Sequence, residues 1–291
     1  MRIIWLVFLT FFLFPLYGEE KPIFTFVHLT DTQISFKPSP SPPLFLKFRI
    51  GPYKRHWLDS QHSETIFKET VLFINSLEVD LVVHTGDITQ EGGKEEMEKA
   101  HQILSLLHSP WGVLMGDHDY DRNQGKFYYS VFKRRNTLFN REGYTLLLFS
   151  IYPSEEDFKW LRVQLKNSSP PVIFFTHRLL YCDPFTRWLA KRFKRVHLLS
   201  PDWRKIRKML KDSQKVVMVV SGHIHGDFLW KREGIYYLTT SSLTEPPHTF
   251  RVFEVYSDSI KTYLYTSPDW RKVKERKWKR EGEKILKIKV R

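Results

Sequence analysis

Apolar and polar residues alternate along the chain in two different periods. Short apolar runs with turn-like ends predict strands, and stretches with apolar residues every three to four positions predict helices between them. This succession of strands and helices predicts an α/β fold, with helices packed on one sheet or on paired sheets. The predicted strands are 24–29, 81–84, 112–115, 146–149, 172–175 and 216–220, and the predicted helices are 64–76, 94–107, 155–165, 185–193 and 202–211.

Two segments depart from this succession. After Phe228 the pattern becomes that of hairpins, with predicted turns at Glu233–Gly234 and near Ser257–Ser259. Earlier, Ile34–Gln61 is first rich in proline and then basic and aromatic, and it is too long for a simple connection. A lid or binding loop fits this segment, and so does a surface excursion without a role.

The ends of the chain differ from its middle. Arg2 and the apolar run Ile3–Leu16 predict a signal peptide over residues 1–18 and therefore an exported protein, periplasmic or secreted. The run is shorter than the ~20 apolar residues that span a bilayer. Because Leu16 stands where a small residue is usual before cleavage, an uncleaved membrane anchor is the alternative. A single domain is predicted at 22–265, followed by a basic C-terminal extension at 266–291.

Charge narrows the choice of partners. The 291 residues carry a formal charge of +14, and their 42% hydrophobic content excludes a mainly disordered chain. Such a balance favours anions, namely phosphorylated substrates, nucleic acid or anionic lipid. The basic extension fits an anionic membrane surface or a solvated helix followed by a short strand at Ile285–Val290. No nucleic-acid fold signature accompanies it, so we predict no specific nucleic-acid partner.

A single cysteine, Cys182, excludes an internal disulfide and is interpreted as a packed thiol.

The candidate catalytic chemistry lies in five segments that place Asp and His where predicted strands end. Such groups gather beyond the carboxyl ends of strands in α/β folds, so the five segments are expected to meet. They read His-Leu-Thr-Asp-Thr-Gln at 28–33, Gly-Asp-Ile-Thr-Gln-Glu-Gly at 86–92, Gly-Asp-His-Asp at 116–119, Thr-His-Arg at 176–178 and Gly-His-Ile-His-Gly at 222–226.

These residue types suit divalent metals. Carboxylate oxygen and imidazole nitrogen together fit Mn, Fe, Zn or Co better than Ca. The seven candidate ligands exceed the roughly four that a single zinc ion needs, which fits two metals that share one bridging carboxylate.

In their order the five segments resemble the calcineurin-like metallophosphoesterase superfamily, whose usual series is Asp-x-His, Gly-Asp, Gly-Asn-His-Asp/Glu, His and Gly-His-x-His. The resemblance implies two packed mixed β-sheets flanked by helices, a four-layer sandwich. It also implies a phosphoesterase in which a metal-bridging hydroxide attacks the phosphorus. One metal would be held by Asp31, Gln33, Asp87 and His225, and the other by Asp87, Asp117, His177 and His223. His118 would face the leaving group, with Asp119 behind it to fix its tautomer.

Two positions depart from the usual series: Gln33 replaces the commoner His, and Asp117 replaces Asn. The added charge of Asp117 predicts firmer cation binding and lower phosphate affinity. Three residues also have structural interpretations without a role in the reaction. Asp119 could cap a turn, Arg178 could be a surface arginine rather than a phosphate contact, and His84 could be a core histidine.

The functional alternative from another class is an exported, non-catalytic binding module with a basic surface. The predicted metal ligands would act only on the phosphoryl group of a substrate. They therefore do not distinguish a phosphomonoester from a phosphodiester.

Overall fold

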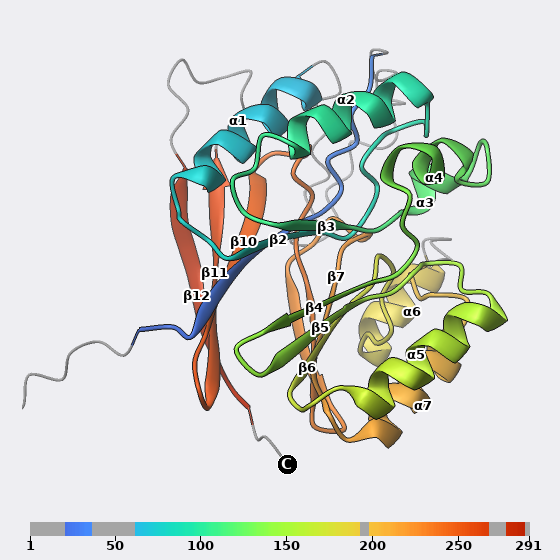
Figure 1. Ribbon diagram of the computed structural model, residues 1–291, viewed down its shortest axis with the longest axis vertical. Helices are drawn as coiled ribbons and strands as arrows, with labels where there is room; N and C mark the ends of the chain where they lie inside the picture. The colour runs from blue at the N-terminus through green and yellow to red at the C-terminus, as the bar shows by residue number, and fades with distance from the viewer. Residues whose placement is uncertain (1–20, 37–61, 193–197, 268–277, 289–291) are drawn as a thin grey trace, which may run out of the picture.

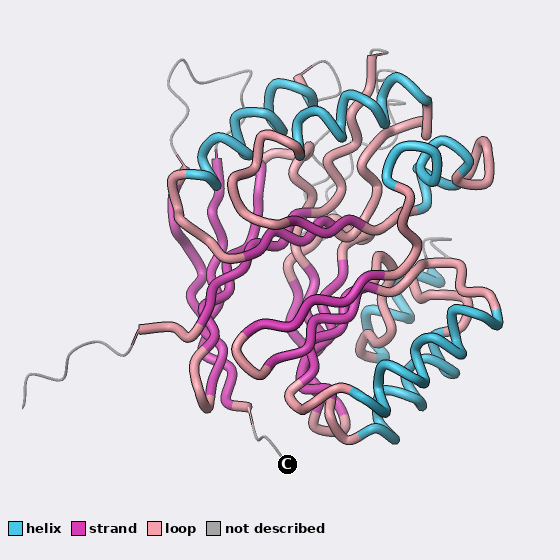
Figure 2. Tube along the Cα trace, viewed as in Figure 1, coloured by secondary structure: helices cyan, strands magenta, loops and turns pink. Residues whose placement is uncertain are grey.

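The computed structural model describes residues 21–36, 62–192, 198–267 and 278–288 (Figure 1). The predicted signal peptide, most of the segment Ile34–Gln61 and residues 268–277 of the extension lie outside this part of the chain. The described residues form two six-stranded sheets with helices on their outer faces (Figure 2).

The first sheet combines three parallel strands with three antiparallel ones. Its order is β12-β11-β10-β1-β2-β3. The strands β1, β2 and β3 run parallel, whereas β10, β11 and β12 continue the sheet antiparallel on the other side of β1. Their bounds are Phe24–Leu29 for β1, Leu81–His84 for β2, Trp111–Val113 for β3, His248–Val255 for β10, Ser259–Ser267 for β11 and Lys279–Lys287 for β12.

The second sheet is also mixed, in the order β4-β5-β6-β7-β9-β8. The strands β5, β6, β7 and β9 are parallel, and the hairpin partners β4 and β8 form antiparallel edges. Their bounds are Thr137–Arg141 for β4, Tyr144–Leu148 for β5, Val172–Phe175 for β6, Val216–Ser221 for β7, Phe228–Arg232 for β8 and Ile235–Thr239 for β9.

The two sheets pack face to face through a shared apolar layer. Phe26 of β1 stacks on Phe253 of β10, with ring centroids 4.4 Å apart, and meets Phe175 of β6 edge-on at 5.7 Å. Both faces of each sheet are covered, so the central strands are continuous apolar runs. This confirms the predicted pair of mixed sheets flanked by helices.

Helices cover the outer faces of both sheets (Figure 1). The core of the first sheet extends to α1, α2 and α4, and that of the second sheet to α5 and α7. The first turn of α5 is capped by Ser154, whose side chain accepts from the Asp157 N–H. The bounds are Ser63–Asn75 for α1, Lys94–Leu104 for α2, Asp117–Tyr120 for α3, Lys126–Phe132 for α4, Glu155–Asn167 for α5, Pro184–Arg192 for α6 and Trp203–Ser213 for α7.

The predicted boundary at residue 265 needs correction, because it falls inside β11. The sheet continues through β12, which pairs antiparallel with β11. Leu286 and the adjoining Ile288 are buried in the layer between the sheets, whereas most other side chains of β12 are exposed. The many Lys, Arg and Glu residues of this edge strand favoured the prediction of a solvated extension.

Other differences are local. The hairpin turns predicted at Glu233–Gly234 and Ser257–Ser259 are present between β8 and β9 and between β10 and β11. The elements α3, α4 and β4 were not predicted, because they are too short to show a clear hydrophobic period. Cys182 is buried, and burial raises the pKa of its thiol, which agrees with a packed side chain. Among the described residues, no helix has both the length and the apolar content needed to cross a membrane.

Candidate metal centre

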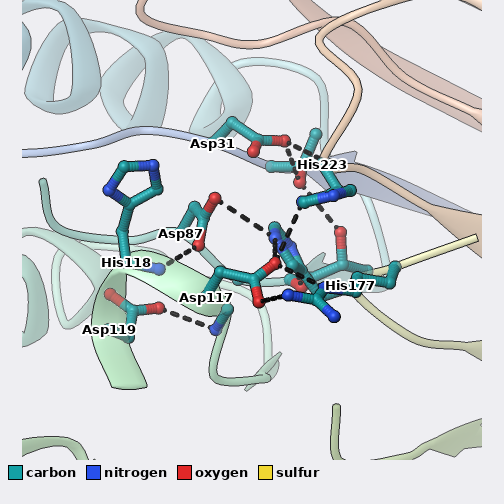
Figure 3. A network of polar contacts seen from close by, with 12 residues as sticks. Asp31, Asp87, Asp117, His118, Asp119, His177 and His223 are labelled. Atoms are coloured by element: carbon teal, nitrogen blue, oxygen red, sulfur yellow. Dashed lines mark hydrogen bonds and ion pairs between the residues drawn. The ribbon is translucent and has the colours of Figure 1, made fainter. Parts of the chain in front are cut away.

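The carboxyl ends of strands from both sheets meet at one place. Asp31 follows β1, Asp87 follows β2 and Asp117 follows β3, whereas His177 follows β6 and His223 follows β7. Asp31 joins the two sheets, because its Oδ2 accepts from the His223 N–H at 3.1 Å. The five predicted segments therefore converge as expected, and Figure 3 shows Asp87 and Asp117 close to His177 and His223.

The backbone is strained at this convergence. Five of the seven predicted ligands have positive φ: Asp31 (53°), Gln33 (42°), Asp87 (51°), His223 (69°) and His225 (50°). Non-glycine residues seldom adopt this left-handed conformation, and such strain clusters at functional sites.

Two glycines allow the segments to approach closely. A Cβ on Gly116 would lie 2.1 Å from the Asp87 nitrogen, and one on Gly222 would lie 1.8 Å from Oγ1 of Thr30. Thr30 in turn donates to Asp31 Oδ2 at 2.6 Å. The glycines of the Gly-Asp-His-Asp and Gly-His-Ile-His segments are thus required by contacts with other segments.

We call Asp117, His177 and His223 the second half of the centre. One ligand atom each from Asp87, His177 and His223 lies within 4.8 Å of the others, an arrangement that could hold a metal ion. His177 Nε2 lies 3.2 Å from Asp87 Oδ2, and His223 Nδ1 lies 3.0 Å from Asp117 Oδ2. His177 Nδ1 contacts the Thr85 carbonyl at 3.0 Å, which leaves Nε2 to face the carboxylates.

We call Asp31, Gln33 and His225 the first half, with Asp87 between the halves. His225 Nε2 lies 3.2 Å from Asp31 Oδ1, and its Nδ1 lies 2.7 Å from Glu245 Oε1. The Gln33 N–H donates to the Asp87 carbonyl at 3.0 Å, so the loop after β1 is held against the loop after β2.

The carboxylates and imidazoles shift one another's protonation. Burial would raise the pKa of Asp31 and Asp117, but neighbouring histidines outweigh it and hold both pKa values well below their usual range. Burial would lower the pKa of His177, yet Asp87, Asp31 and Asp117 raise it to about 9. Asp31 and Glu245 likewise raise the pKa of His225 against the effect of burial. The pocket therefore keeps ionised carboxylates and would release protons when it takes up a cation.

Unsatisfied buried atoms test whether the pocket fits metals. Within the described residues, Asp31 Oδ1, Gln33 Oε1 and His177 Nε2 are buried and lack a hydrogen bond of good geometry. Buried polar atoms are normally satisfied, so such a group of exceptions needs an explanation. The atoms are oxygen and nitrogen donors from both halves, as divalent transition metals require. The residues therefore fit the predicted cations.

The predicted contact between His118 and Asp119 is wrong. Asp119 is buried and accepts from the N–H groups of Ile88, Thr89 and Gly116, at 3.1, 2.9 and 2.9 Å. It thereby joins the loops after β2 and β3, which is the turn-capping alternative. Burial and the nearby Asp87 carboxylate raise the pKa of Asp119 to about 6.

His118 is oriented by other groups. Its Nδ1 lies 3.0 Å from the Gln90 carbonyl, and its backbone N–H donates to Asp87 Oδ1 at 2.9 Å. In Figure 3 the His118 ring and the Asp119 carboxylate point in opposite directions. A neutral imidazole that donates from Nδ1 keeps Nε2 as its other functional nitrogen.

Arg178 is not a surface arginine. Only 9% of it is exposed, and its guanidinium contacts both oxygens of Asp117, with Nε 2.9 Å from Oδ2 and Nη2 close to Oδ1. The Tyr152 hydroxyl donates to Asp117 Oδ1 at 2.8 Å. No phosphate contact of Arg178 is needed to explain this position.

Three residues of the centre were missed from the sequence: Glu245, Tyr152 and Gln90. Gln90 lies inside the segment 86–92 but was given no role, whereas Glu245 and Tyr152 lie in no recognisable motif. Glu245 precedes two prolines in the loop before β10, and Tyr152 lies in the loop before α5. They reach the ligands through long-range contacts, so a single sequence contains no local signal for them.

Similarity to known proteins agrees with this geometry. The chain is 23% identical over 208 residues to a 3',5'-cyclic-nucleotide phosphodiesterase of Nostoc, a match that covers 64% of this chain and 75% of that protein. It is 28% identical over 190 residues to a probable glycerophosphodiester phosphodiesterase of Arcobacter nitrofigilis, covering 59% of this chain and 67% of that protein. A third relative, the uncharacterised YvnB of Bacillus subtilis, is 25% identical over 232 residues, which span 70% of this chain but only 16% of that protein.

A solved structure shares the fold. The dimetal phosphatase from Danio rerio superposes with a TM-score of 0.65 at 14% identity, and the match covers 92% of this chain and all of that one. The model of the calcineurin-like phosphoesterase family matches residues 24–227, which include all seven predicted ligands. With its two mixed sheets and converging Asp and His segments, the chain belongs to the calcineurin-like phosphoesterase family.

Proposed function

We propose that this protein is a hydrolase of phosphodiesters that depends on two divalent metal ions. The observation that carries the proposal is the convergence of Asp87, His177 and His223 within 4.8 Å, beside buried oxygen and nitrogen atoms that lack a hydrogen bond of good geometry. Two relatives named as phosphodiesterases favour a diester over a monoester. When bound, two such cations would activate water and neutralise the phosphoryl oxygens.

The residues of the chain have distinct tasks in this proposal. Asp87 lies between the halves and serves both. Its Oδ1 accepts from the His118 N–H, while its Oδ2 faces His177. His118 is oriented by Gln90 through Nδ1, so its Nε2 would face the substrate. In the imidazolium form, with both nitrogens protonated, Nε2 would give its proton to the departing alkoxide and leave a neutral imidazole.

The experiment is metal reconstitution. Protein stripped of metal is resupplied with Mn, Fe, Zn, Co or Mg and assayed with bis-p-nitrophenyl phosphate and p-nitrophenyl phosphate. Asp87→Ala should lose turnover by about 1000-fold or more, because it disrupts both halves. His118→Ala should lose about 100-fold or more, the usual contribution of proton transfer. His108→Ala, an exposed histidine after α2, is the matched control and should keep full activity.

The outcomes separate the alternatives. Metal-dependent turnover that prefers the diester supports the proposal, and preference for the monoester would move it to phosphomonoesters. Folded, metal-loaded protein without turnover on either ester would contradict the proposal and favour the non-catalytic binding module.

We also propose export, on the pattern of residues 1–18, and contact of the basic residues 266–291 with an anionic membrane surface. N-terminal sequencing of protein recovered outside the cytoplasm tests the first. Cosedimentation with phosphatidylserine vesicles tests the second, and binding that is equally strong to neutral vesicles would contradict it.

A further inference from the structure

The carboxylate of Asp117 is shared between the metal pocket and a second set of groups behind it. Oδ2 faces His223 Nδ1 at 3.0 Å and His177 Nε2 at 3.5 Å. Oδ1 points to the Tyr152 hydroxyl, and Arg178 spans both oxygens.

The Asp117–Arg178 pair is held rigidly. Asp117 is 7% exposed and Arg178 is 9% exposed. The guanidinium also contacts the Tyr152 hydroxyl at 3.2 Å and lies 5.5 Å from the centre of its ring. A planar guanidinium fixes a carboxylate through two parallel hydrogen bonds, a geometry that an ammonium group does not reproduce.

The pair matters because its charges cancel. In the series that this sequence resembles, the position of Asp117 belongs to a neutral Asn. Asp117 alone would add a negative charge to the pocket, but the guanidinium bonded to the same carboxylate adds a positive one. The expectation of lower phosphate affinity considered Asp117 without this partner.

We propose that Arg178 is a positioning residue that balances Asp117, so that the pair offers the second half one carboxylate oxygen at the net charge of a neutral amide. This inference rests on the metal centre of the proposed function. Changing one member of the pair then leaves an unbalanced charge in a buried site. Changing both members to neutral residues restores the balance.

The test is a double-mutant cycle on cation affinity. Full-length wild type, Asp117→Asn, Arg178→Met and the double variant are stripped of metal and titrated with Mn²⁺ or Zn²⁺ against a chromophoric chelator. Asp117→Asn leaves the Arg178 cation uncompensated beside the pocket and should weaken cation binding by about tenfold or more. The double variant should recover to within about threefold of wild type.

Arg178→Met distinguishes charge balance from simple support. It leaves Asp117 with its full negative charge, so cation affinity should hold or rise while affinity for inorganic phosphate, measured by calorimetry on metal-loaded protein, falls. Arg178→Lys restores the positive charge but not the two parallel hydrogen bonds of a guanidinium, so it should recover part of the phosphate affinity. Arg207→Met is the matched control, since Arg207 pairs with Glu233 and lies beside the Tyr181 ring. It should change neither affinity, and thermal unfolding checks that each variant is folded.

The outcomes also separate this inference from the proposed function. A double variant that binds cations as weakly as Asp117→Asn would overturn the charge balance, as would equal weakening by Arg178→Met, whatever the turnover of the wild type. Recovery in the double variant without phosphodiester turnover supports the balance and rejects only the proposed reaction. Wild-type protein that binds no divalent cation overturns both.

Discussion

The two halves of the candidate metal centre have groups of opposite charge next to their predicted ligands, on the side away from the metals. In the first half, the predicted ligand His225 contacts the carboxylate of Glu245 at 2.7 Å. In the second half, the anionic ligand Asp117 contacts the guanidinium of Arg178. His177 belongs to the second half, and its Nδ1 contacts the neutral Thr85 carbonyl.

The difference sets the charge of each half. Asp31 and Glu245 give the first half two carboxylates, and among the described residues no Lys or Arg side chain is bonded to them, only His225, which would bind metal. Asp117 and Arg178 cancel in the second half. A carboxylate behind a histidine also makes the imidazole a stronger ligand. We therefore expect the first half to bind its cation more tightly than the second half.

The largest effect is expected on stability, at Asp119, which joins the loops that carry predicted ligands of both halves. Asp119→Ala would remove the acceptor for three buried N–H groups in the loops that hold Asp87 and Asp117. Each unsatisfied group costs about 1–3 kcal/mol, so the free energy of unfolding should fall by roughly 3 kcal/mol or more. Urea unfolding of metal-free protein measures it.

Asp121→Ala is the control for this change, because Asp121 is exposed at the end of α3. If Asp119 acted mainly through His118, its variant would lose activity at nearly unchanged stability. That result would restore the role predicted from the sequence.

A smaller effect should separate the two halves. Glu245→Gln keeps an oxygen near His225 but removes the charge behind it, so the tighter cation should be bound about 10 to 100-fold more weakly. Competition with a chelator measures both binding steps. The weaker step should change little. Glu254 lies on β10, is partly buried and accepts from the hydroxyls of Tyr256 and Tyr263. The control Glu254→Gln should change neither binding step.

The smallest effect concerns the pH dependence of stability, through the buried His84. His84 is buried under the Asp87 loop, where its Nδ1 accepts from the Gly86 N–H, and burial lowers its pKa from 6.5 to about 3. The unfolded chain binds this proton below pH 6.5 and the folded chain does not, so stability falls as the pH drops from about 6.5 toward 3. The expected slope from this group is about 1.4 kcal/mol per pH unit.

His84→Asn keeps an acceptor but cannot be protonated. Comparing urea unfolding at pH 5 and pH 7.5 should therefore show a shallower loss in the variant than in wild type. An equal loss in both proteins would place the pH dependence elsewhere, and the buried His28 would be the next group to change.

Much of the fold could be predicted from the spacing of apolar residues along the chain. Long elements such as α1 and α5 were predicted within two residues at each end, because each buries one face over three turns or more. The strand β12 was predicted poorly because it lies at a sheet edge. Its charged side chains point to solvent, and only pairing with β11 makes it part of the domain.

By itself the sequence determined the kinds of ligand and their places just after predicted strands, because a motif is local chemistry carried by adjacent residues. Only the tertiary structure decided which group stands behind each ligand. Arg178 lies 61 residues from Asp117, and Asp119 lies 30 residues from Thr89. Asp117 and Arg178 come together only when the two sheets pack, and Asp119 and Thr89 only when β2 and β3 pair within the first sheet. Their charges depend on that packing because a buried group is governed by what it touches, not by its neighbours in the chain.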